Sequence, residues 1–374
     1  ISLGDDYGAI ASFNKAIEID PQDAGAYVNR GIPKIKLTDY QGAIADFNKA
    51  IEIDPQDDAA YNNRGGSNYF LGNYLAAIID FNKALEINPQ NAGTHASRGL
   101  AKYKSKDYQG AISDYNKAIA IDPQHAGAYI NRGSGKAESG DFQGAILDFN
   151  KAIENNHPDP MAYYNRGLAK SELGDYQGAI ADYTKAIEIN PQLSAAYSKR
   201  GSAKLALNDY QGSIADYNKA LKINPDDAFS YKDRGNAKFH LGNHQGAISD
   251  YSKSLEIDPR NAAVYTIRGA IKENFLGDYQ QAISDYNMAI QIDPQFAPAY
   301  NNRGWVNYKL GYNHKAIADY SKAIDISRSY HLAYRNRGIA KADIGDLKNA
   351  CTDWRKAVSL GNKDALKALK KYCL

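Results

Sequence analysis

Arginine and aspartate recur together along this chain at a fixed separation. Ten Arg-Gly dipeptides are spaced by 34 residues, except for one interval of 35 that follows Arg268. An aspartate follows each arginine after 16 residues, or after 17 in the case of Arg268. A guanidinium fork and a carboxylate form a bidentate ion pair, so the spacing predicts a bridge inside each repeat. Catalysis by these pairs is not expected, since one site would then be copied ten times. Representative pairs are Arg30 with Asp46, Arg166 with Asp182, and Arg337 with Asp353.

The two ends of the chain indicate that the arginine pairs within its own repeat. The opening fragment has no preceding arginine, and Ser12 stands at its aspartate position. At the other end Asp353 is present, although no arginine follows Arg337. Both observations favour pairing within a repeat over pairing between neighbours.

A row of amide side chains directly precedes these arginines. The residue before the arginine is asparagine in six of the ten repeats, although asparagine is a poor helix former. An amide both donates and accepts, so such a row could hold the backbone of an extended peptide. The alternative is a solvated face copied by repeat duplication. The six residues are Asn29, Asn63, Asn131, Asn165, Asn302 and Asn336.

The asparagine row is interrupted, and apolar residues lie near it. Lys199, Asp233 and Ile267 replace asparagine, so a longer N-terminal segment and a shorter C-terminal one are expected. Exposed apolar side chains on this face could anchor a side chain of a bound peptide. The candidates are Met161, Tyr164, Leu168, Phe229 and Trp305.

Other chemistry receives little support from the sequence. His240 and His244 have the spacing of a metal pair, but Gly242 lies between them and no third ligand is near in sequence, so no metal is expected. Neither a glycine-rich phosphate loop nor a recognisable nucleophile, histidine and acid set occurs. We therefore expect no cofactor and no enzymatic activity.

Charge and hydropathy narrow the class of partner. The net charge is +2, and acidic residues accompany the lysines in every repeat, so nucleic-acid binding is not expected. Lysines such as Lys170 recur at one phase and are interpreted as solubilising. No stretch approaches 18 apolar residues, so membrane insertion is not expected.

Helical periodicity explains how each repeat positions these residues. In residues 159–192, apolar and small residues recur every three or four positions in two runs. Gly174 allows a left-handed turn between the runs, Asp175 can cap the second helix, and Pro191 ends it. Each unit is therefore predicted to be a helix, a tight turn, a second helix and another turn.

Small and aromatic residues predict a stacked core between the helices. Gly167 is expected to face Ala179, since a larger residue on either side would separate the backbones. The position of Ala179 holds alanine, or in one repeat serine, in all ten repeats, and an aromatic residue follows it four positions later without exception. These rings are predicted to fill the space between neighbouring hairpins: Phe47, Phe81, Tyr115, Phe149, Tyr183, Tyr217, Tyr251, Tyr286, Tyr320 and Trp354.

The chain resembles the tetratricopeptide repeat family. The resemblance depends on a 34-residue frame that contains, in order, tyrosine, Arg-Gly, Gly-Asp-Tyr, alanine, an aromatic residue, alanine and proline. The Asn-Arg-Gly variant is similar to arrays common in bacterial proteins. The resemblance implies an all-α, right-handed superhelical solenoid whose first helices line a concave groove, and some peptide-binding members use an asparagine row at this phase. Members of the family can also bind the C-terminal carboxylate of a chaperone tail through a clamp of lysine and asparagine side chains. Lys232 and Asn236 match the first pair of this clamp, but Ile267 and Pro298 stand at its later positions, so the clamp is not expected here. The expected parts are a half repeat in residues 1–23, ten repeats in 24–361 and a capping helix in 362–374.

The ends and irregular repeats give further expectations. The half repeat leaves Ile10, Phe13 and Ile17 without a first helix, so upstream residues or a second copy should cover them; a head-to-tail contact would build rings or filaments. The extra residue near Phe275 should alter its hairpin, and the connection at His157 should deviate from the others. Cys351 and Cys373 should approach each other, with two buried thiols favoured over a disulfide, which would indicate an oxidising compartment.

These observations lead to one main functional hypothesis and one alternative. The main hypothesis is a non-enzymatic scaffold that binds an extended peptide or partner protein in its groove. The alternative is a self-assembling subunit that docks through its N-terminal half repeat. Because the chain opens partway through a repeat, a soluble cytoplasmic protein and an exported one are both consistent with it.

Overall fold

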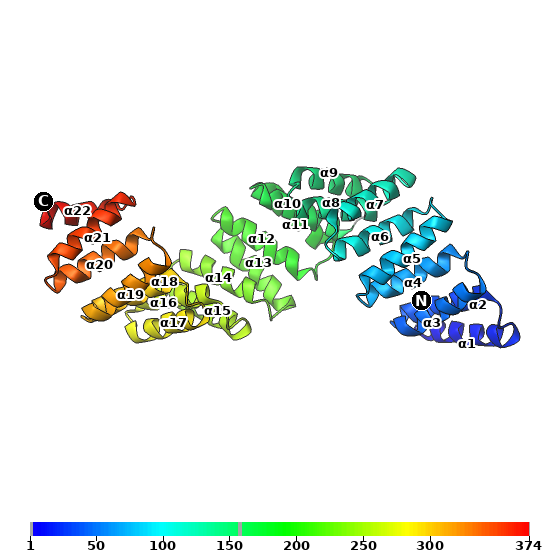
Figure 1. The fold of residues 1–374 in the computed structure, drawn as a ribbon, viewed down its shortest axis with the longest axis horizontal. Helices are drawn as coiled ribbons and strands as arrows, with labels where there is room; N and C mark the ends of the chain where they lie inside the picture. Colours follow the sequence, from blue (N-terminus) through cyan, green and yellow to red (C-terminus); the bar gives the residue numbers. More distant parts are fainter. Residues whose placement is uncertain (1–2, 156–158, 374) are drawn as a thin grey trace. The chain divides into compact units, whose positions relative to one another are not determined.

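The computed structural model describes residues 3–155 and 159–373, and in these ranges the regular elements are 22 helices. They divide into two compact units, Ile1–Pro191 and Gln192–Leu374. Within each unit, consecutive helices pack side by side along the chain (Figure 1). The prediction of an all-α solenoid of tandem helix pairs is confirmed. Across the described ranges, none of the helices combines the length and apolarity that a bilayer crossing requires.

The N-terminal unit begins with a single helix and continues with five pairs. Its helices are α1 (Leu3–Ile19), α2 (Ala24–Lys36), α3 (Tyr40–Ile53), α4 (Asp58–Phe70), α5 (Tyr74–Ile87), α6 (Ala92–Lys104), α7 (Tyr108–Ile121), α8 (Ala126–Glu138), α9 (Phe142–Glu154), α10 (Pro160–Glu172) and α11 (Tyr176–Ile189). The expected deviation at His157 lies outside the described residues.

The C-terminal unit consists of five pairs and a last, single helix. Its helices are α12 (Ser194–Ala206), α13 (Tyr210–Ile223), α14 (Ala228–His240), α15 (His244–Ile257), α16 (Ala262–Leu276), α17 (Tyr279–Ile292), α18 (Ala297–Lys309), α19 (Asn313–Ile326), α20 (His331–Asp343), α21 (Leu347–Ser359) and α22 (Lys363–Tyr372). The extra residue near Phe275 lengthens α16 to 15 residues, against 13 in the other first helices.

Local chemistry sets the helix boundaries. Gly174 adopts a φ of +79°, which turns the chain between α10 and α11 at little steric cost. The Asp175 carboxylate then accepts the backbone N–H of Gly178 at 2.9 Å and caps α11. Asn190, before Pro191, has left the helical region with φ −128° and ψ 92°, and α11 ends there.

The core consists of aromatic rings from the second helices, packed against glycines of the first. The Tyr183 ring is 1% exposed, and a Cβ atom added to Gly167 would lie 2.7 Å from it. The same glycine-on-ring contact recurs in every pair. The helices of a pair can therefore approach closely only because the first helix has no side chain at this point.

A buried carboxylate joins the two helices of each pair. Asp182 is 3% exposed and accepts from Arg166 Nε at 2.9 Å, with Nη2 on its other oxygen. Lys170 Nζ also lies 2.8 Å from Asp182. The Arg–Asp bridge is repeated in all ten pairs.

The lysines four residues after the repeat arginines do more than solubilise the surface, which corrects the interpretation made from the sequence. In eight repeats the lysine lies on the same aspartate as the arginine. In the two repeats without it, Asn68 and Asn307 donate to Asp80 and Asp319 at 3.1 and 3.0 Å. A cation is therefore replaceable here, whereas a hydrogen-bond donor is present in all ten repeats.

The arginine also joins neighbouring repeats. Arg166 Nη1 donates at 2.6 Å to Asn150, which lies on the second helix of the preceding pair. Arg132 donates in the same way to Asn116 at 2.6 Å. The ion pair is thus internal to a repeat, as the ends of the chain indicate, but the same guanidinium also binds the repeat before it.

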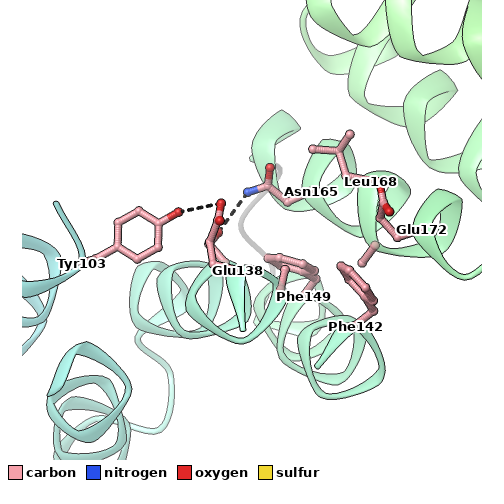
Figure 2. A pocket seen from close by; sticks show the side chains of 10 residues that line it. Tyr103, Glu138, Phe142, Phe149, Asn165, Leu168 and Glu172 are labelled. Carbon is pink, nitrogen blue, oxygen red and sulfur yellow. Dashed lines mark hydrogen bonds between the residues drawn. The ribbon is translucent and has the colours of Figure 1, made fainter. Parts of the chain in front are cut away.

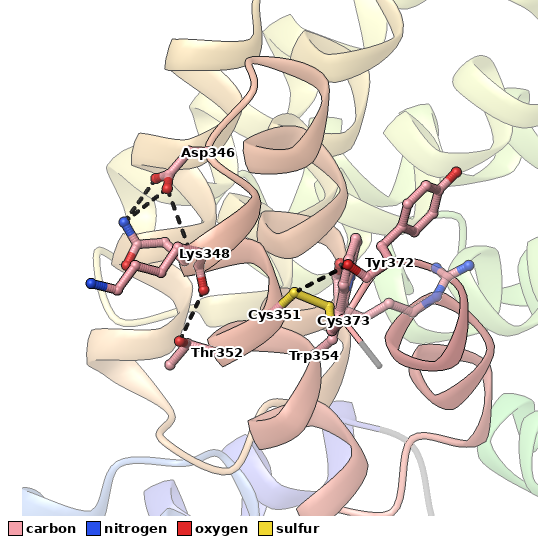
Figure 3. Close-up of a disulfide and its surroundings, with 9 residues drawn as sticks. Asp346, Lys348, Cys351, Thr352, Trp354, Tyr372 and Cys373 are labelled. Atoms are coloured by element: carbon pink, nitrogen blue, oxygen red, sulfur yellow. Dashed lines mark hydrogen bonds between the residues drawn. A yellow bond between two sulfur atoms is a disulfide. The ribbon is translucent and has the colours of Figure 1, made fainter.

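The C-terminal helix α22 covers the last pair and is joined to it covalently (Figure 3). Leu369 packs in one cluster with Trp354, and the Tyr372 ring stacks on Trp354 with centroids 5.8 Å apart. This packing places Cys373 over Cys351, with Cα atoms 5.7 Å apart, and the two form a disulfide. The expectation of two buried thiols is therefore wrong.

The N-terminal helix α1 is covered less completely than the other second helices. Ile10, Phe13 and Ile17 remain partly exposed, whereas Phe47, at the same phase as Phe13, is fully buried. Ile19 is 86% exposed.

Candidate functional site

We define the first-helix face by the side chains that directly precede the repeat arginines and by the residues one helical turn before and after them. Asn29 is exposed on this face, and Asn63 and Asn131 are partly buried. Among the described residues, none of these three side chains has a hydrogen-bond partner. Three amides of the N-terminal unit are therefore available to a ligand.

The remaining asparagines are engaged to different degrees. Asn165 donates to Ser134 Oγ at 3.4 Å, a long contact that leaves its oxygen open. In the C-terminal unit, Asn301 donates to Asn302 at 3.1 Å, and Asn336 donates to Asn301 at 3.2 Å. Asn336 is only 7% exposed, so the expectation that it faces a ligand is corrected: its amide belongs to an internal ladder.

The apolar candidates also divide. Met161 and Phe229 are 39% and 40% exposed. The Tyr164 ring packs against Tyr183 with centroids 5.9 Å apart, and burial raises the pKa of its hydroxyl. Trp305 stacks on Tyr308 at 5.5 Å. Tyr164 and Trp305 are therefore supported by the array, whereas Met161 and Phe229 project from it.

Phe229 lies between two lysines. The ammonium groups of Lys199 and Lys232 are 5.1 and 4.6 Å from the centre of its ring. Lys232 also lies 3.3 Å from Asp233, which interrupts the asparagine row. These contacts make the start of the C-terminal unit a charged stretch of the first-helix face rather than an amide-rich one.

A pocket of about 340 Å³ opens on the first-helix face between α8 and α10 (Figure 2). Asn165 and Leu168 are the two sequence candidates that it brings together. Sequence reasoning missed the rest of the lining. The other residues are Tyr103, Ser134, Ala137, Glu138, Phe142, Phe149, Ala169 and Glu172.

The two histidines with metal-pair spacing are explained by ring stacking. His240 stacks on Tyr210 with centroids 4.8 Å apart, and His244 stacks on Phe275 at 3.8 Å. In the ranges that the structure describes, no three metal-binding side chains come together. Phe275 also lines a smaller, apolar pocket of about 190 Å³ with Phe239 and Ile267.

Core tyrosines place their hydroxyl groups against polar side chains of the first helices. Tyr183 hydrogen bonds Ser171 at 3.2 Å, and the Tyr251 hydroxyl donates to Asn236 at 2.7 Å. Tyr286 donates to the buried Glu273 at 2.7 Å, where burial raises the pKa of the carboxyl and this bond opposes the shift. The hydroxyl of Tyr115 is buried without a partner among the described residues.

This difference predicts opposite outcomes for the same substitution. Tyr251→Phe should destabilise the chain by about 1 kcal/mol, because Asn236 loses its donor. Tyr115→Phe should leave stability unchanged or raise it, since no bond is lost and phenylalanine already occupies this position at Phe47, Phe81 and Phe149. Urea unfolding of both variants measures the difference, and an equal loss in both would contradict the assignment.

The molecule is a tandem array of helix pairs, defined by the repeated hairpin, its glycine-on-ring core and its two capped turns. Comparison with known families identifies the repeat family to which this array belongs. Models of the tetratricopeptide repeat match residues 1–23, 58–91, 160–193, 228–261 and 297–330. A further model, described as TPR repeat, matches residues 35–72, 99–134, 201–242 and 276–311. The chain belongs to the tetratricopeptide repeat family. Arrays of this family are protein–protein interaction scaffolds and are typically non-enzymatic.

Solved structures similar to parts of this chain include other arrays of the kind. A tetratricopeptide repeat protein from Parabacteroides merdae is 26% identical, covers 67% of this chain and 98% of its own, and has a TM-score of 0.49. MamA is 29% identical over 44% of this chain and 96% of its own, with a TM-score of 0.41. YrrB, described as having an unusual peptide-binding site, is 20% identical over 48% of this chain and 92% of its own, with a TM-score of 0.43.

With TM-scores below 0.5, these similarities add nothing to the family assignment, which depends on the repeat models. No curated protein matches the sequence.

Proposed function

We propose that this protein is a non-enzymatic scaffold that binds an extended peptide segment of a partner protein along the first-helix face of its N-terminal unit. The supporting observation is that amides at one phase, including Asn63 and Asn131, have no partner among the described residues. An amide can donate to a peptide carbonyl and accept from a peptide N–H, whatever side chains the peptide has. The amide of Asn165 continues the row beside the pocket.

A peptide-library pulldown tests this proposal. The variant Asn131→Ala/Asn165→Ala should lose at least about tenfold in capture, because two amide contacts of about 1 kcal/mol each disappear. Gln143→Ala is the matched control, since it removes an exposed amide from the second helix α9. Unaltered capture by the asparagine variant, with an unchanged circular dichroism spectrum, would refute groove binding.

Self-assembly through α1 is a second candidate, supported by the partly exposed side chains of Ile10, Phe13 and Ile17. Contact with another copy would cover them, and a head-to-tail contact does not close on itself unless the rotation permits a ring. Light scattering over a range of concentrations should then show a rising mass, and Phe13→Lys should return the chain to a monomer. A constant monomer mass at high concentration would exclude this candidate.

A further inference from the structure

The pocket between α8 and α10 exists because two side chains of α8 are small. Ala137 stands at the repeat position that tyrosine occupies at Tyr69 and Tyr103. One turn earlier, Ser134 is also small. The Phe142 and Phe149 rings line the hollow that results. Its volume of about 340 Å³ is at the lower end for a ligand site, which suits a single side chain.

Two carboxylates line this pocket without a cationic partner. Glu138 and Glu172 are exposed, and in the described part of the chain neither forms an ion pair. Among the described residues, Glu138 accepts a single hydrogen bond, from the Tyr103 hydroxyl at 3.3 Å (Figure 2). By contrast, Glu154 on the second helix α9 is paired with Lys151 at 2.7 Å.

The lysines that precede these two carboxylates in sequence are paired elsewhere. Lys136 lies two residues before Glu138, but its ammonium is 2.9 Å from Asp148. Lys170, two residues before Glu172, is 2.8 Å from Asp182. Both are held on buried aspartates by the repeat's own ion-pair network, so neither pairs with the carboxylates beside the aromatic lining.

We propose that this pocket receives a lysine or arginine side chain of the bound peptide; the inference depends on the proposed function. The methylene stem would pack against the phenylalanine rings, and the cation would lie near their faces and the carboxylates of Glu138 and Glu172. Asn131 and Asn165, on the two helices that flank the pocket, would hold the peptide backbone beside it. The pocket thus selects a basic residue at one position of an otherwise sequence-tolerant site.

Position-scanned peptide libraries test this selection. Random dodecapeptides with a fixed central lysine, arginine, norleucine or glutamate are immobilised, and the full chain is captured on each. Lysine and arginine libraries should retain about tenfold more protein than norleucine, with the difference falling as salt rises. Equal capture on the lysine, arginine and norleucine libraries would overturn the pocket assignment.

Two kinds of variant locate the preference. Glu138→Gln/Glu172→Gln should remove the advantage of lysine and arginine over norleucine, whereas Glu154→Gln, on the second helix, should keep it. Ala137→Tyr refills the hollow with the residue found at Tyr103 and should also remove the advantage. A preference that survives both changes overturns the proposal.

The pocket assignment and the proposed function predict different negative results. If the libraries are captured but without preference, and Asn131→Ala/Asn165→Ala abolishes capture, the pocket assignment falls and the proposed function stands. If no library is captured by the folded chain, the proposed function falls and the pocket assignment falls with it.

Discussion

Asp182→Ala is expected to lower the free energy of unfolding by about 3–5 kcal/mol, the typical result of breaking a buried ion pair. The Asp182 side chain is buried and accepts from Arg166 and Lys170 at 2.9 and 2.8 Å. Without the carboxylate, two cations remain beside each other with no counter-charge. Urea unfolding followed by circular dichroism measures the loss.

The chain itself provides the matched control for this prediction. Lys170→Asn should cost only about 1 kcal/mol, because asparagine already holds this position at Asn68 and Asn307 and donates to the aspartate there. The carboxylate keeps its arginine in that variant. Equal and small effects of Asp182→Ala and Lys170→Asn would show that the bridge does not hold the two helices together.

The repeat period predicted the architecture because every hairpin repeats the same constraints. Gly167 and Tyr183, for example, are 16 residues apart, and only a hairpin brings a glycine onto a ring at that distance. The role of Lys170 was missed, since a lysine at one phase of a helix is usually solvated. It lies four residues after Arg166, on the same side of α10, and so reaches the same carboxylate.

The candidate site was harder to predict because it depends on neighbours and on empty space. The six asparagines look equivalent in the sequence, but Asn336 is engaged by Asn301, a residue outside the row. The pocket beside Asn165 forms because the side chain of Ala137 is small. A small residue in a sequence does not by itself show whether its neighbours fill the space that it leaves. The disulfide likewise depended on how α22 lies over α21, which the spacing of two cysteines does not determine.

Two adjacent glycines of α4 should respond in opposite ways to the same substitution. A Cβ atom on Gly65 would lie 2.9 Å from the Phe81 ring and 3.2 Å from the backbone oxygen of Ala77, whereas on Gly66 it would meet nothing within 4 Å. Gly65→Ala should destabilise the chain by about 1–3 kcal/mol through overpacking. Gly66→Ala should stabilise it by about 1 kcal/mol, because alanine favours the helix.

The sign of the stability change in Gly65→Ala distinguishes an effect of helix propensity from an effect of the contact between α4 and α5. Propensity alone would make both substitutions stabilising, since both glycines lie inside the same helix. Only the close approach of α4 to the buried ring on α5 separates them, because Phe81 is 1% exposed and has little room to shift. Urea midpoints of the two variants, compared with the unchanged chain, give the answer. If Gly65→Ala proves as stabilising as Gly66→Ala, the glycine-on-ring contact that sets the spacing of every pair does not exist in solution.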